Sequence, residues 1–357
     1  MACACGLGNR TNAEVERPPA GLRLGPGEQC FNLISGREIQ ADRAIHARIR
    51  PRGIAAIIAA PKEALGADFD SFLARQRGIE SAADFSTAFP ERPTRLKPSP
   101  CTKRLDRKPN NMVEIPARQF HMKTQFRIRE LGFYESTHPH FVGRGFHPLH
   151  LPIWFERDVA IRRFAIEITP VTNGQFAAFL RASGYKPRHD HNFLRHWTNG
   201  APPAGREQHP VVWVDLEDAR AYANWAGKRL PTEEEWQYSA QGDDGRVWPW
   251  GNNFDQSRCN DGASGGTTPV NAYPEGKSPF GVSDMCGNTW EWTESERSDG
   301  RTRFAIIRGG SWYDPKGSDW HMDGGPKPVN FAAKFLLMWA GLDRCATLGF
   351  RCAGDLK

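Results

Sequence analysis

The sequence has no run of eighteen consecutive apolar residues, so it predicts no membrane-spanning helix. The N-terminus, from Met1 to Gly6, also lacks a basic start followed by a long apolar core, which argues against a secretory signal. From these two absences we expect a protein that does not bind membranes and that resides in the cytoplasm.

Paired cysteine motifs are missing as well. The eight cysteines are dispersed along the chain, and no two of them have the Cys-x-x-Cys spacing. This pattern argues against a zinc ribbon and against a disulfide framework. With no export signal, buried free thiols are the simplest expectation.

An excess of charge is present only in the first 110 residues, which hold 18 Lys and Arg against 12 Asp and Glu. The remainder holds 29 of each sign, so the net charge of +6 belongs to the leading segment. The basic residues there are scattered and are not interleaved with aromatic residues. We therefore expect no nucleic-acid partner.

The composition divides the chain into four parts. Residues 1–20 have little apolar content and are predicted to be disordered. Residues 21–89 are predicted to form a small β-rich segment with one helix. Prolines with basic residues between them predict a stiff linker over 90–110. The main domain is expected over 111–357.

Within the small segment, three short apolar runs at 31–34, 44–49 and 54–59 predict strands. Residues 68–77 predict an amphipathic helix.

Capping signals identify helices in the main domain. Asp215 is expected to cap a helix over 216–225, and Thr232 with Glu235 forms a capping box for the next helix. An earlier helix is expected over 173–182. The helix over 216–225 is expected to bury Ala221, Tyr222 and Trp225.

A series of short motifs then follows one order along two thirds of the chain. The motifs are Met112–Pro116, Phe164–Phe176, His209–Val214, Lys228–Trp236, Trp248–Asn252, Gly287–Trp292, Arg308–Trp312 and Leu348–Cys352. Together they resemble the formylglycine-generating enzyme, or sulfatase-modifying factor, family. The resemblance implies an irregular, loop-rich α+β fold related to C-type lectins, preceded here by the small β-rich segment.

The resemblance also identifies a changed active centre. In the enzymes that define the family, one redox cysteine follows the position of Trp312 by two residues and a second follows it by seven. Here these positions are Asp314 and Asp319. The chain therefore resembles a divergent member that is not a copper formylglycine oxidase, because Cu(I) prefers soft thiolates to hard carboxylates. The residue that pairs with Cys352 in several members is replaced by Ala240.

Several roles stay open for the residues at this centre. Asp314, Asp319 and His321 are candidate catalytic residues, as an acid–base pair or as ligands of a hard divalent ion. The alternative is that they are ordinary solvated loop residues. Aromatic rings stack on sugars and other flat ligands, and the candidate ligand-binding residues are Trp312, Tyr313, Trp320 and Arg308.

A segment of the family that wraps calcium resembles residues 284–291. The resemblance implies that the side chains of Asp284 and Glu291 and the carbonyls of Gly287 and Thr289 bind Ca²⁺, which prefers oxygen ligands. The alternative is a glycine turn without a metal.

An insertion over 323–347 contains an apolar run from Phe331 to Leu342. A core element, a lid and an oligomer contact are all consistent with it, and the core element is favoured because apolar runs are more often buried.

Two functions are compatible with these residues. The first is a ligand- or substrate-binding domain with a structural calcium, whose partner is a small molecule, a glycan or a peptide. A likeness of the leading segment to the β-sandwich that follows a glycoside-hydrolase barrel implies a carbohydrate-related role. The second is a divergent metal-dependent oxidoreductase with iron or another divalent ion, held by the residues of the changed centre or by the histidines between His138 and His150. The oligomeric state stays open.

Overall fold

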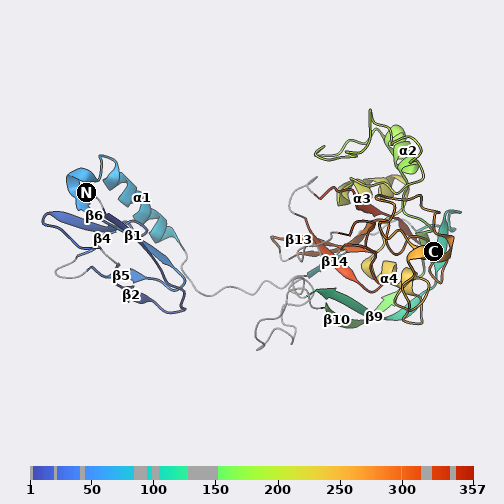
Figure 1. The fold of residues 1–357 in the computed structure, drawn as a ribbon, viewed down its shortest axis with the longest axis horizontal. Coiled ribbons are helices and arrows are strands. Elements are labelled where there is room, and N and C mark those ends of the chain that lie inside the picture. Colours follow the sequence, from blue (N-terminus) through green and yellow to red (C-terminus); the bar gives the residue numbers. More distant parts are fainter. Residues whose placement is uncertain are drawn as a thin grey trace. The chain divides into compact units, whose positions relative to one another are not determined.

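The computed structural model describes most of the chain. The described residues are 3–19, 22–40, 45–83, 95–98, 104–127, 152–298, 300–314, 324–337 and 343–357. The chain folds as two compact units, Met1–Glu91 and Arg92–Lys357 (Figure 1).

The first unit is a small β-structure with one long helix. Its main sheet is antiparallel, in the order β1 (Cys3–Gly8), β6 (Ile54–Pro61), β3 (Glu28–Asn32) and β4 (Arg37–Glu38). β2 (Val15–Arg17) pairs with β5 (Ala47–Ile49), and η1 (Lys62–Ala64) leads into α1 (Phe69–Ala82). One face of β6, formed by Ala55, Ile57 and Ala59, is buried in the core of this unit.

The prediction of disorder over residues 1–20 is wrong for β1 and β2. β1 pairs along its whole length with β6, which lies about fifty residues further along the chain, from Cys3 opposite Ala59 to Gly8 opposite Ile54. The partner of a strand supplies its backbone hydrogen bonds, and local composition carries no information about a partner that distant. The strands predicted at 31–34, 44–49 and 54–59 and the helix predicted at 68–77 are present with shifted bounds.

In the part that the structure describes, the second unit contains three sheets. β8 (Met112–Ile115), β11 (Phe164–Glu167) and β16 (Ala353–Asp355) form the first, with β11 in the centre. β9 (Arg118–Arg127) and β10 (Pro152–Ile161) form an antiparallel pair. The largest sheet has the order β14 (Ala332–Leu336), β13 (Arg303–Arg308), β12 (Trp290–Ser298) and β15 (Leu348–Phe350), and β7 (Arg95–Lys97) also pairs with β12.

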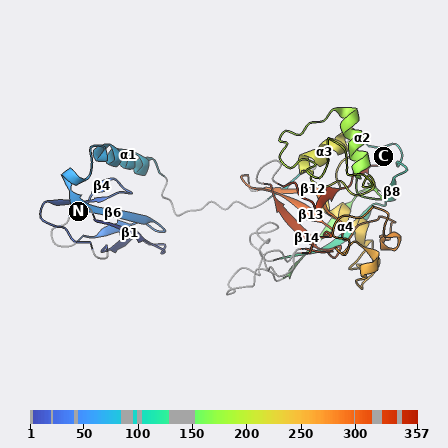
Figure 2. The ribbon, with the colours of Figure 1, turned by 45° about the horizontal axis from the view of Figure 1, so that its top comes forward.

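The helices of the second unit begin where the sequence predicts. Among the described residues they are α2 (Asn173–Ser183), α3 (Leu216–Trp225) and α4 (Glu233–Gln241), and the short η3 (Gln256–Arg258) and η4 (Pro274–Gly276) follow α4. The Asp215 side chain accepts from Asp218 N at 2.8 Å, and the Thr232 side chain accepts from Glu235 N at 3.2 Å. α4 packs against β12 and β13, beside the large sheet (Figure 2).

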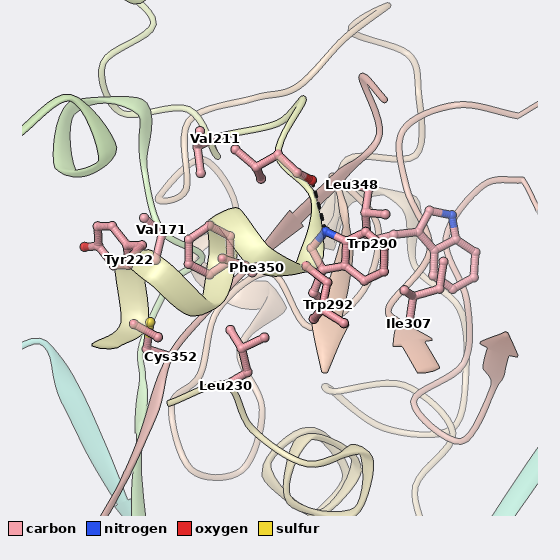
Figure 3. Close-up of a cluster of buried hydrophobic side chains, with 14 of the residues drawn as sticks. Val171, Val211, Tyr222, Leu230, Trp290, Trp292, Ile307, Leu348, Phe350 and Cys352 are labelled. Atoms are coloured by element: carbon pink, nitrogen blue, oxygen red, sulfur yellow. Dashed lines mark hydrogen bonds between the residues drawn. The ribbon is translucent and has the colours of Figure 1, made fainter. Parts of the chain in front are cut away.

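An aromatic cluster forms the main core of this unit (Figure 3). Trp292, Phe350 and Tyr222 lie in it, and the rings of Tyr222 and Phe350 meet edge to face at 5.4 Å. Trp292 Nε1 donates to Val214 O at 3.1 Å, which satisfies the one polar atom of this buried ring. The core thus joins α3, β12 and β15.

The structure also answers two questions about apolar segments. The first part of the inserted run forms β14 against β13, and Ala332 and Ala333 are buried, so this part is a core element of the large sheet. Residues 338–342 of the run lie outside the described residues. Trp225, predicted to be buried, is 45% exposed. It lies at the last position of α3, where its ring contacts Phe179 and Tyr222 from outside.

A buried charge cluster fixes the start of α3. The Arg344 guanidinium lies 2.7 Å from Asp215 and 2.8 Å from Asp218, and all three side chains are buried. It also donates to the carbonyls of His189 and His191. Burial raises the pKa of Asp218 to about 7, the Asp215 carboxylate acts in the same direction, and Arg344 opposes both.

Replacing Arg344 with Met should lower the free energy of unfolding by about 3–5 kcal/mol, because two carboxylates would stay buried without a counter-charge. Arg163→Met is the matched control. Its ion pair with Glu114 at 2.7 Å is half exposed, and solvent screens such pairs so that they contribute little to stability. Urea unfolding followed by tryptophan fluorescence measures both. Equal losses in the two variants would contradict the role assigned to the cluster.

Candidate functional site

Two glycines carry the chain from β13 to the candidate site. Gly309 and Gly310 have φ of 94° and 78°, a region that side-chain-bearing residues rarely adopt. A Cβ on Gly310 would collide with the backbone of Gly325 and Lys327. The chain can therefore reach residues 311–314 along this path only with glycine at Gly310.

The segment Ser311–Asp314 is held by main-chain bonds. Trp312 N donates to Asn288 O at 3.1 Å, Ser311 N donates to Gly325 O at 3.1 Å, and Gly325 N donates to Tyr313 O at 2.8 Å. These bonds tie the segment to the residues before β12 and to the start of the insertion. Its position thus depends little on its own side chains.

The aromatic side chains of this segment lie at the surface. Trp312 is half-buried, and its Nε1 donates to Ala346 O at 3.4 Å. Tyr313 is 51% exposed, and its ring meets that of Trp312 edge to face at 5.7 Å. The two rings contact each other edge to face, and the exposed ring of Tyr313 suits contact with a flat ligand.

Asp314 is exposed, and its side chain lies next to Gly325. Asp319, Trp320 and His321 lie outside the described residues. The predicted pairing of Asp314 with Asp319 therefore stays a prediction.

Arg308 does not face a ligand, contrary to the sequence-based expectation. Its side chain is fully buried and donates to Phe331 O at 2.9 Å and to Gln237 Oε1 at 2.9 Å. It also lies 3.4 Å from the Glu233 carboxylate. Arg308 thus stabilises the turn at Gly309 through contacts within the core.

The described thiols do not replace the missing redox pair. Cys259, Cys286 and Cys352 are buried and free, and burial raises the pKa of Cys286 and of Cys352 well above the ordinary value. Cys345 is half-buried, and its Sγ lies 3.4 Å from the Thr347 hydroxyl. Cys352 has no disulfide partner, as the presence of Ala240 implies.

The predicted calcium segment begins at a buried carboxylate. Asp284 has a φ of 55°, and its Oδ2 accepts from Asn288 Nδ2 at 3.4 Å. Burial raises the pKa of Asp284 to about 7, and the Glu291 carboxylate acts in the same direction against Arg351. A divalent cation at this position would remove the cost of burying the charge.

Glu291, the second predicted carboxylate ligand, already has partners. Its carboxylate accepts from Arg351 at 2.6 and 2.7 Å and from Trp236 Nε1 at 2.7 Å. Each carboxylate oxygen offers two lone pairs, so these three bonds leave capacity for a metal. Carboxylate oxygens are the ligands that Ca²⁺ prefers, and the calcium site over residues 284–291 stays a prediction.

A richer metal site is absent from the part of the chain that the structure describes. No group of three or more His, Cys, Asp or Glu side chains there is placed to hold a metal ion. His196 is buried, which lowers its pKa to about 4, and His189 and His191 contribute their carbonyls to Arg344. The histidines between His138 and His150 lie outside the described residues.

A second concave region was not predicted as a site from the sequence. A hollow of about 570 Å³ is lined by residues 250–256 and Arg258. The Trp248–Asn252 motif served only for the family resemblance. The available signal was the interleaving of Trp248, Trp250 and Phe254 with polar residues in one short stretch.

Comparison with known proteins agrees with this geometry. A family model described as "Sulfatase-modifying factor enzyme 1-like domain" matches residues 99–356. The chain belongs to the sulfatase-modifying factor family. The described part of the chain contains no helix that is both long and apolar enough to cross a bilayer.

Relatives in this family include both inactive and active proteins. "Inactive C-alpha-formylglycine-generating enzyme 2" of Bos taurus is 34% identical over 248 residues, which cover 55% of this chain and 79% of the bovine protein. "Formylglycine-generating enzyme" of Mycobacterium tuberculosis is 37% identical over 210 residues, covering 42% of this chain and 69% of that protein.

Among solved structures, PvdO from Pseudomonas aeruginosa is similar with a TM-score of 0.49 and 26% identity. The match covers 73% of this chain and all of PvdO.

In protein treated with a chelator, the free energy of unfolding should fall as the pH rises from about 4 through 7. The folded pKa of Asp284 lies above the ordinary value of 3.8, so its contribution is fully present below pH 4 and is lost through the folded pKa. Asp284→Asn should remove the part of this slope that comes from Asp284, and its free energy of unfolding should exceed that of the wild type at pH 8 by up to about 4 kcal/mol. The part that comes from Asp218, whose pKa is also raised to about 7, should stay in both proteins. Urea unfolding at pH 4, 6 and 8 measures the difference. Parallel pH profiles of the two proteins would contradict the assignment.

Proposed function

We propose that this protein is a ligand-recognition member of the sulfatase-modifying factor family and does not form formylglycine with copper. One observation carries the proposal: the position of the first redox cysteine holds Asp314, an exposed carboxylate beside the rings of Trp312 and Tyr313. A carboxylate is a hard ligand and does not substitute for a thiolate on Cu(I).

The recognition surface in this proposal is the segment Trp312–Asp314. Main-chain hydrogen bonds hold its backbone in place, and the ring of Tyr313 is exposed to solvent. Such pre-ordering reduces the entropy lost when a ligand binds. The ligand class is a small molecule, a glycan or a peptide that stacks on an aromatic ring and donates to a carboxylate.

The relatives support the absence of oxidase activity without deciding it. The bovine and mouse proteins at 34% identity carry the word inactive in their names. Relatives named formylglycine-generating enzyme are also similar, at 37% identity. Similarity to these relatives therefore does not by itself assign oxidase activity to this chain.

A structural calcium ion is the second part of the proposal. Asp284 and Glu291 would supply carboxylate oxygens, and Gly287 and Thr289 would supply carbonyls. The support is the buried charge of Asp284, whose carboxylate has no cationic side chain in hydrogen-bond contact in the described residues. Calcium here would stabilise the segment that also accepts the Trp312 N–H through Asn288.

Elemental analysis of protein purified without added metal or chelator tests the proposal. We expect calcium near one ion per chain, and no stoichiometric copper, iron or manganese. Asp314→Ala and Asp319→Ala should leave this metal content unchanged. The matched positive control is the double variant Asp314→Cys, Asp319→Cys, which restores the soft ligands of the family and should gain stoichiometric Cu(I).

Two results would overturn the proposal. A stoichiometric transition metal in the wild type that is lost in Asp314→Ala or Asp319→Ala would support the metal-dependent oxidoreductase instead. Copper-dependent formylglycine formation by the wild-type protein would exclude the recognition role as the sole function of the site.

A further inference from the structure

The hollow beside η3 has an aromatic floor. Trp248 and Trp250 are stacked at 6.1 Å with 12° between their planes, and Phe254 lies 4.8 Å from Trp248. Phe254 is still 46% exposed after these contacts. An aromatic face that is packed on one side and open on the other is the usual geometry of a stacking platform.

The floor is rigid because a tight turn orders it. Trp248 N donates to Gly251 O at 2.8 Å, and Gly251 N donates back to Trp248 O at 3.1 Å. Gly251 has a φ of 145°, which favours glycine at this position. Trp250 Nε1 donates to Asn253 O at 3.0 Å, which fixes the orientation of its ring. A ligand would therefore meet an ordered surface.

The rim is polar and carries balanced charge. Asn252, Asn253 and Gln256 are exposed, and the side-chain amides of Asn253 and Gln256 make no hydrogen bond within the described residues. Asp255 and Arg258 pair with each other at 3.0 Å, so their charges cancel. Amides both donate and accept, as a ligand rich in hydroxyl groups requires.

We propose that this hollow binds a neutral carbohydrate, with a sugar ring stacked on Phe254 and its hydroxyls bonded to Asn253 and Gln256. The volume of about 570 Å³ lies within the range of small-ligand sites. Because the charges of Asp255 and Arg258 cancel, the rim has no net charge to attract an anionic ligand. A purely apolar ligand would cover the amides of Asn253 and Gln256 without replacing their hydrogen bonds to water, which is unfavourable. The hollow shares no residue with the segment Trp312–Asp314, so this proposal goes beyond the proposed function.

The test is titration of the full chain with defined neutral oligosaccharides, namely maltoheptaose, cellohexaose, chitohexaose and mannohexaose, followed by saturation-transfer NMR and calorimetry. We expect at least one of them to bind. Phe254→Leu, which keeps an apolar contact with Trp248, should weaken that binding at least tenfold. Asn253→Ala with Gln256→Ala should have an effect of similar size.

One control separates this hollow from other aromatic surfaces. Trp154→Ala removes an exposed ring on β10 and should leave the affinity unchanged. Lack of binding to all four oligosaccharides overturns the inference. Binding that survives Phe254→Leu, or that is lost in Trp154→Ala, overturns it as well and places the sugar elsewhere.

Discussion

The second unit depends on one buried ion pair, between Arg351 and Glu291. Both side chains are fully buried, and the guanidinium contacts the carboxylate through two nitrogens at 2.6 and 2.7 Å. Its other N–H groups donate to the carbonyls of Glu167, Ile168 and Ser283. Such a pair is stabilising only when every remaining donor has an acceptor, and here each nitrogen of Arg351 has at least one.

This pair joins segments that lie far apart in the sequence. Arg351 follows β15, Glu291 lies in β12, and the carbonyls belong to the end of β11 and to Ser283. Trp236 from α4 donates to the same carboxylate. The functional segments are therefore positioned by polar contacts inside the core. The aromatic cluster around Trp292 supplies the apolar burial.

The fold could be predicted from the sequence where its signals are local or belong to the family. Capping residues such as Asp215 and Thr232 act within one helical turn, so α3 and α4 begin where expected. β1 could not be predicted, because its stability comes from β6 about fifty residues away. At the site, the motifs could not predict the burial of Arg308, because its contacts come from Glu233 and Gln237 on α4.

The main-chain anchoring of Ser311–Asp314 has a consequence for how this family can change. The bonds from Trp312 N to Asn288 O and from Gly325 N to Tyr313 O use no side-chain atom. The exposed residues Tyr313 and Asp314 can therefore be exchanged without disturbing the backbone of the segment, provided that Gly310 is kept. The backbone path to Tyr313 and Asp314 is therefore compatible with different side chains at these two exposed positions.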